Sequence, residues 1–214
     1  MSRSWLTVPN AITVSRIAAC PVIFVLAMSP STAARFWAFA LFVVAAVSDI
    51  FDGYLARRDG LVTDMGKLLD PFADKLLLVA SYVPIYLVSH REGGIDGLPW
   101  WGPMPLWVMV VIFGREIFIT VFRSFAAQRG VVIAAGIAGK RKALFQAIFA
   151  GGALLWFPLR TFAVGRSGGV EAWGGAFAVL GAVTAISLAI ALVLTVYSLI
   201  DYMWSYRNVV GIRD

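Results

Sequence analysis

Long apolar runs alternate along the chain with short polar segments rich in charge, proline or glycine. A helix needs ~20 residues to cross the hydrocarbon core of a bilayer. The clearest run, residues 176–200, has that length without a single charge. Three others, at 36–48, 76–88 and 104–113, reach it only if the charged residues at their ends also lie within the helix. The pattern predicts an all-α integral membrane protein, a bundle of six transmembrane helices at about 11–29, 34–58, 63–89, 104–128, 140–162 and 174–205.

The composition agrees with this prediction and excludes a soluble or disordered chain. Of 214 residues, 60% are hydrophobic and 14% are charged, whereas a soluble domain is roughly half apolar and about a quarter charged. Six spans leave no room for another domain, so we treat residues 1–214 as a single membrane domain. Arg3 precedes an apolar run as in a signal peptide. Cleavage is not expected, because Arg16 interrupts that region and five more spans follow.

The loop charges predict the orientation of the bundle. With six spans both termini share one side, and lysines and arginines concentrate on the cytoplasmic side of membrane proteins. The side of the termini would hold Arg3, Arg57, Arg58, Lys67, Arg129, Lys140, Arg141, Lys142, Arg207 and Arg213. The opposite side would hold only Arg35, Arg91, Arg160 and Arg166. Both termini are therefore expected in the cytoplasm, and the net charge of +6 reflects topology and anionic lipids rather than nucleic acid.

Acidic residues gather in one short stretch. Six of the 12 lie between Asp49 and Asp74. At ~100° per residue, one face of the second predicted helix carries Asp49, Asp52, Gly53, Ala56 and Arg57, and one face of the third carries Gly66, Asp70 and Asp74. The turn between these helices is short, which predicts that they are antiparallel neighbours and bring four carboxylates together.

Four adjacent carboxylates need compensation, because like charges at close range repel. Oxygen ligands without histidine or thiolate suit Mg²⁺, Mn²⁺ or Ca²⁺, and two such ions can clamp a phosphoryl group during its displacement. Gly53 and Ala56 leave room for a ligand, and Arg57 can hold a phosphate. The alternative is a set of solvated helix-end acids paired with nearby lysines and arginines. Cys20 and His90, the only cysteine and histidine, are given no role.

A basic group lies in the fourth and fifth predicted spans. It comprises Arg115, Arg123, Lys140, Arg141 and Lys142, with Glu116 beside Arg115. Charges within a span usually face a polar cavity and mark function. A phosphorylated acceptor molecule would explain the group, whereas anchoring to acidic lipids is the alternative.

The acidic pattern, Asp49-x2-Asp52-Gly53-x2-Ala56-Arg57-x8-Gly66-x3-Asp70-x3-Asp74, resembles the full signature of the CDP-alcohol phosphotransferase family. The resemblance implies two divalent cations, Mg²⁺ or Mn²⁺, a cytoplasm-facing site and a homodimer. It implies that Asp49, Asp52, Asp70 and Asp74 bind metal and that Asp74 is also the catalytic general base. It assigns the CDP site to Asp52, Gly53, Ala56, Arg57 and Gly66.

Three further segments resemble bacterial phosphatidylglycerophosphate synthases within that family. They are Val8-Pro9-Asn10-x-Ile12-Thr13-x-x-Arg16, the run Leu69–Lys75, and Arg115-Glu116-Ile117 with Arg123, Lys140, Lys142 and Gln146. The similarity spans about the first 150 residues. It implies a bacterial inner-membrane enzyme that transfers the phosphatidyl group from CDP-diacylglycerol to sn-glycerol 3-phosphate, whose phosphate would contact Arg115, Arg123, Lys140 and Lys142. The alternative acceptors are inositol phosphate and phosphatidylglycerol. The alternative function is that of a divalent-cation transporter.

Overall fold

The computed structural model describes residues 8–58, 64–91, 97–129, 137–164 and 174–206. In these ranges the chain forms six helices and no strand beyond one isolated bridge. The helices are α1 (Val8–Met28), α2 (Thr32–Arg58), α3 (Asp64–Ser89), α4 (Leu106–Gln128), α5 (Ile137–Val164) and α7 (Gly174–Ser205). Each end lies within three residues of its predicted position, which confirms the all-helical prediction.

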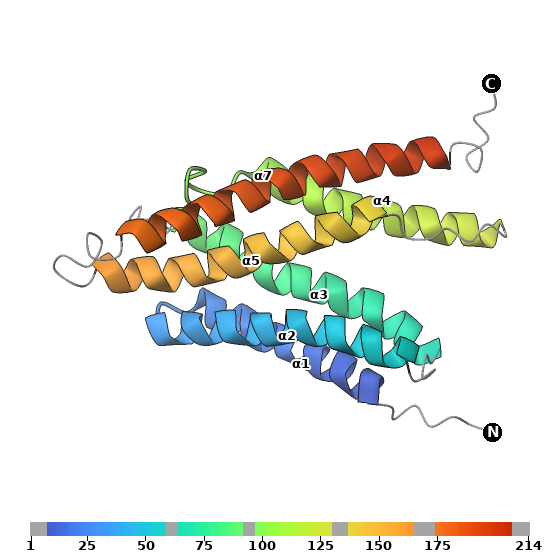
Figure 1. The fold of residues 1–214 in the computed structure, drawn as a ribbon, viewed down its shortest axis with the longest axis horizontal. Helices are drawn as coiled ribbons and strands as arrows, with labels where there is room; N and C mark the ends of the chain where they lie inside the picture. Colours follow the sequence, from blue (N-terminus) through green and yellow to red (C-terminus); the bar gives the residue numbers. More distant parts are fainter. Residues whose placement is uncertain (1–7, 59–63, 92–96, 130–136, 165–173, 207–214) are drawn as a thin grey trace.

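The helices run roughly along one axis and alternate in direction (Figure 1). α1, α3 and α5 begin toward the end of the bundle at which α2, α4 and α7 finish. α1 packs against both α2 and α3, while α5 packs against α2 and α7, and α4 packs against α7. The sequence predicted α2 and α3 as direct neighbours. In the described part of the chain they make few contacts, because α1 lies between them.

The bundle buries alanines together with large apolar side chains, and it also exposes many apolar side chains on its outside. Alanines at helix contacts are almost fully buried, among them Ala38, Ala73 and Ala153, as expected where membrane helices approach closely. Val25 and Val193 are more than 60% exposed. An apolar exterior of this kind suits lipid rather than water.

Five helices, all but α4, are long and apolar enough to cross a membrane. α4 has 23 residues but carries Arg115, Glu116 and Arg123. These findings are those of a multi-pass membrane protein.

Glycine permits a close approach of α5 to α7 at Gly152. A β-carbon added at Gly152 would lie 2.4 Å from Thr184 Oγ1 and 3.3 Å from Thr184 Cβ. Thr184 is fully buried, and its hydroxyl donates to the carbonyl of Leu180 at 2.8 Å. This contact joins α7 to the rest of the bundle.

Candidate active site

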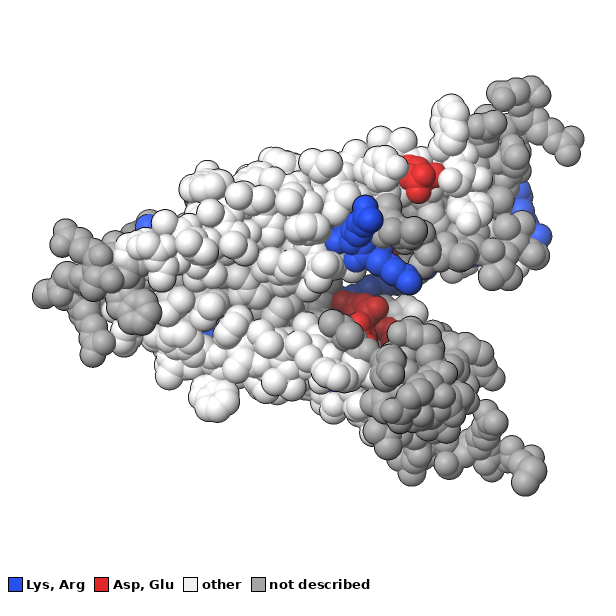
Figure 2. Space-filling view, viewed as in Figure 1, with Lys and Arg blue, Asp and Glu red and all other residues white. Residues whose placement is uncertain are grey.

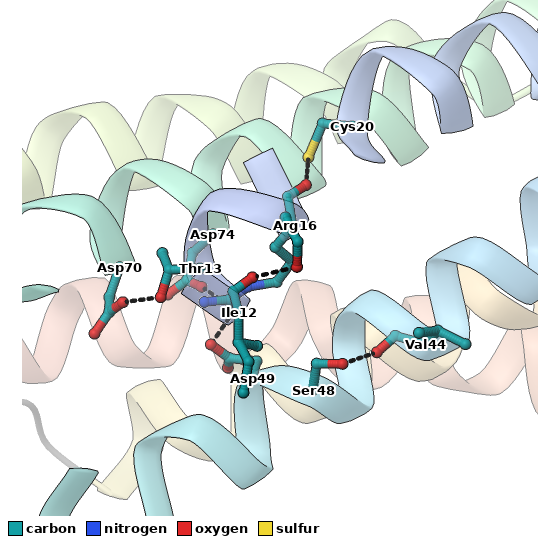
Figure 3. A network of polar contacts seen from close by, with 10 residues as sticks. Ile12, Thr13, Arg16, Cys20, Val44, Ser48, Asp49, Asp70 and Asp74 are labelled. Carbon is teal, nitrogen blue, oxygen red and sulfur yellow. Dashed lines mark hydrogen bonds and ion pairs between the residues drawn. The ribbon is translucent and has the colours of Figure 1, made fainter. Parts of the chain in front are cut away.

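The acidic half of the site is built on one buried polar face of α1. Asn10, Thr13 and Arg16 are at most 6% exposed, and their three-residue spacing places them along the same side of the helix. Thr13 Oγ1 donates to Asp70 Oδ1 at 2.9 Å. Figure 3 shows the side chains of Thr13 and Arg16 pointing toward aspartates on α2 and α3.

Arg16 links two of the predicted metal ligands. Its Nη1 donates to Asp49 Oδ1 on α2 and to Asp74 Oδ1 on α3, the latter at 3.3 Å. The guanidinium is buried, whereas the side chains of Asp49 and Asp74 are 44% and 59% exposed. One cation therefore compensates two carboxylates that remain open to water.

Three of the four predicted metal ligands thus meet α1, namely Asp49, Asp70 and Asp74. Their oxygen donors are of the type that Mg²⁺ and Mn²⁺ prefer. Among the described residues no group of three potential ligands lies close enough to hold an ion. Arg16 lies between Asp49 and Asp74 and pairs with both.

The rest of the acidic signature is described only in part. Gly66 is buried in the first turn of α3. Asp52, Gly53, Ala56 and Arg57 belong to the last turns of α2, but their side chains lie outside the described residues. Their predicted roles in metal and CDP binding stay predictions.

A cavity of about 230 Å³ opens beside the carboxylates. Its lining includes Asp49 and Asp74 on one side and Glu116, Lys142 and Gln146 on the other. Figure 2 shows a hollow on this face, with basic side chains on one side and acidic side chains on the other. The cavity therefore connects the acidic group to the basic group.

A second cavity of about 260 Å³ lies among α4, α5 and α7. All four residues predicted to bind the acceptor phosphate line it: Arg115, Arg123, Lys140 and Lys142. Such a concentration of cations suits an anion. The fold gathers these residues around one space, whereas helical spacing related only Arg115 to Arg123. The role of all four residues in binding phosphate stays a prediction.

Glu116 joins the two cavities, since it lines both of them. Its Oε1 accepts hydrogen bonds from Lys142 Nζ and, at 3.3 Å, from Arg115 Nη1. Arg123 has a different partner, because its Nε donates to Tyr202 Oη at 3.4 Å and its guanidinium lies 5.8 Å from the centre of that ring. Tyr202 thereby brings α7 into the basic site.

Sequence reasoning gave no role to four residues at the centre of this arrangement: Thr13, Arg16, Glu116 and Gln146. All four fell within segments that carried the resemblance, so a signal was present. Their partners lie 26 to 64 residues away along the chain, and helix periodicity cannot identify partners at such separations.

Comparison with protein families gives a match over most of the chain. The model of the CDP-alcohol phosphatidyltransferase family matches residues 6–197. This range includes every residue of the acidic signature and of the first cavity, and all four cations of the second.

Curated relatives carry more specific names. A protein of Mycobacterium tuberculosis, named probable phosphatidylglycerophosphate synthase, is 34% identical over 210 residues, covering 96% of this chain and 84% of the relative. Proteins of Rickettsia bellii and Bacillus subtilis are both named CDP-diacylglycerol–glycerol-3-phosphate 3-phosphatidyltransferase. The first is 36% identical over 138 residues, covering 64% of this chain and 69% of its own. The second is 35% identical over 159 residues, covering 69% and 76%.

Proposed function

This chain belongs to the CDP-alcohol phosphatidyltransferase family, and on that premise we propose that it transfers the phosphatidyl group of CDP-diacylglycerol to sn-glycerol 3-phosphate. The products are phosphatidylglycerophosphate and CMP. The observation that carries the proposal is the cavity in which carboxylates face a cationic group. The names of the relatives from Rickettsia bellii and Bacillus subtilis support the same acceptor.

In the proposed reaction the primary hydroxyl of glycerol 3-phosphate attacks the β-phosphorus of CDP-diacylglycerol. The new bond joins that oxygen to phosphorus, and the bond from phosphorus to the oxygen of CMP breaks. Asp74 is proposed to accept the hydroxyl proton as general base. Its side chain lines the cavity and is exposed. Holding both reactants in this orientation lowers the barrier further.

Two divalent cations, Mg²⁺ or Mn²⁺, are the proposed cofactors, held by Asp49, Asp52, Asp70 and Asp74. When bound they supply positive charge that stabilises the diphosphate as charge develops on it. Gly53, Ala56, Arg57 and Gly66, together with Asp52, are proposed to bind the CDP group. From α1, Thr13 contacts Asp70, and Arg16 pairs with Asp49 and Asp74.

The acceptor phosphate is proposed to bind Arg115, Arg123, Lys140 and Lys142. Arg115 and Arg123 lie within α4, and Lys142, in the second turn of α5, is only 4% exposed. A plain alcohol gives no reason to place such cations within a span, since charges are costly within a membrane. A phosphorylated acceptor accounts for it.

We further propose that all six helices cross the inner membrane of a bacterium, with both termini and the site on the cytoplasmic side. The alternating helix directions support an even number of crossings (Figure 1). α4 can be the sixth span because Arg115, Glu116 and Arg123 line a cavity. The excess of loop lysines and arginines on the side of the termini favours this orientation. A homodimer is also proposed, on the family resemblance alone.

The test is CMP release by purified protein in detergent with CDP-diacylglycerol and Mn²⁺. Glycerol 3-phosphate, inositol phosphate, serine and phosphatidylglycerol are offered one at a time, and Asp70→Asn serves as the blank. We expect turnover with glycerol 3-phosphate alone. Turnover only with another acceptor would contradict the assignment of the basic cavity. Metal flux into sealed vesicles without nucleotide would favour a transporter instead.

A further inference from the structure

Glu116 and Gln146 line the space between the acidic and the basic groups. Both residues line the 230 Å³ cavity that also contains Asp74 and Lys142. Under the proposed function, the acceptor's phosphate lies toward the cations and its reacting hydroxyl toward Asp74. The carbon chain that joins these two ends therefore passes the side chains of Glu116 and Gln146.

Gln146 carries a buried hydrogen-bond donor in the wall of this space. The residue is 5% exposed, and its Nε2 has no hydrogen-bond partner among the described residues. Its backbone carbonyl accepts from Tyr82 Oη at 3.3 Å, which ties this turn of α5 to α3. Buried polar groups are nearly always paired, so an unpaired amide lining a cavity points to a ligand group that can accept a hydrogen bond.

Glu116 presents an acceptor to the same space. Within the described part of the chain, both of its hydrogen bonds, from Lys142 and Arg115, go to Oε1, and Oε2 accepts none. The two cations neutralise the carboxylate while leaving this oxygen available. Gln146 lies four residues after Lys142, so the two side chains project from the same face of α5 about one turn apart.

A donor and an acceptor together match a hydroxyl group, which can accept one hydrogen bond while donating another. We infer that Gln146 Nε2 and Glu116 Oε2 bind the secondary hydroxyl of the acceptor, and that this pair makes the site selective for a phosphate ester carrying two adjacent hydroxyls. The inference rests on the proposed function, because it concerns the acceptor of that reaction. It assigns specificity to two residues outside both the carboxylate and the phosphate-binding groups.

The test compares sn-glycerol 3-phosphate with propane-1,3-diol monophosphate, which keeps the phosphate and the primary hydroxyl but lacks the secondary hydroxyl. The kcat/KM for CMP release is measured for both acceptors with purified, full-length protein, CDP-diacylglycerol and Mn²⁺. For the wild type we expect a preference for glycerol 3-phosphate of about 10- to 100-fold, the range for a lost hydrogen bond to a charged group. In Gln146→Leu the preference should fall below about threefold, and in Glu116→Gln it should fall by a smaller factor.

Gln128→Leu is the matched control, because Gln128 is exposed at the end of α4 and its loss should leave the preference unchanged. A merely structural role would lower kcat/KM for both acceptors equally and leave their ratio unchanged. The inference is overturned if the wild type uses both acceptors equally well, or if folded Gln146→Leu keeps the wild-type ratio. If Gln146→Leu does not fold, the wild-type ratio and Glu116→Gln decide. A wild type that does not use glycerol 3-phosphate would instead overturn the proposed function.

Discussion

Replacing Arg16 by methionine tests how α1 holds the acidic site together. Methionine is an unbranched, adaptable apolar residue that can fill much of the space of the arginine stem, but it removes the cation between Asp49 and Asp74. A hydrogen bond to a charged group contributes about 1.5–3 kcal/mol. Asp49 and Asp74 are about half exposed, so water can replace part of each contact. We therefore expect a total loss of about 1.5–3 kcal/mol when no divalent ion is present.

The same substitution should tighten the binding of the proposed metal ions, because Arg16 and the ions compete for the same carboxylates. At 1.4 kcal/mol per factor of ten, a competing contact of that strength raises the Kd for Mn²⁺ about 10- to 100-fold. Arg16→Met should therefore bind Mn²⁺ tighter by that factor, and saturating Mn²⁺ should close the stability gap. Arg16→Lys keeps a cation, so its Mn²⁺ affinity should lie between those of the wild type and Arg16→Met.

Thermal unfolding in detergent with EDTA, and calorimetric titration with Mn²⁺, measure these two effects. Equal stability of wild type and Arg16→Met in EDTA would show that the contacts contribute nothing. Weaker Mn²⁺ binding by Arg16→Met would refute competition and would mean that Arg16 positions the ligands for the ion.

Two further predictions concern the basic cavity and the packing of α5. Arg123→Gln should raise the KM for glycerol 3-phosphate about tenfold or more, with a smaller change in kcat. Arg129→Gln is the control, because Arg129 lies at the exposed end of α4, 4.2 Å from the Phe125 ring centre, and its loss should leave the steady-state KM unchanged. Equal effects of the two substitutions on KM would contradict the assignment of the cavity. Gly152→Ala should lower the free energy of unfolding by about 1–3 kcal/mol through overpacking against Thr184. Adding Thr184→Ala should restore the thermal midpoint, a recovery that an unrelated defect would not show.

Much of the fold could be predicted from the sequence, because helix length is set by the bilayer and by turn residues that are local signals. The helix ends followed from these signals alone. The neighbours of each helix did not, since a short connection between α2 and α3 suggested direct packing. The structure places α1 between them in the described residues, and only the contacts of Thr13 and Arg16 reveal why α1 is polar there.

The candidate site could be predicted to a similar extent. Residues that share a helix face, such as Asp70 and Asp74 or Arg115 and Arg123, could be grouped from the sequence because one helix fixes their spacing. The meeting of Glu116 with Lys142 depends on how α4 packs near α5, which periodicity does not specify. The unpaired amide of Gln146 likewise becomes visible only once its surroundings are known.

The most direct test of the account measures phosphatidylglycerophosphate formed from CDP-diacylglycerol and radiolabelled glycerol 3-phosphate. Wild type is compared with Asp74→Asn and with Asp64→Asn, a matched control at the start of α3 outside the acidic signature. The account predicts similar product formation by wild type and Asp64→Asn. It predicts a rate about 100- to 10,000-fold lower for Asp74→Asn, the range for removal of a general base. No product from the wild type, or near-full turnover by folded Asp74→Asn, would contradict it.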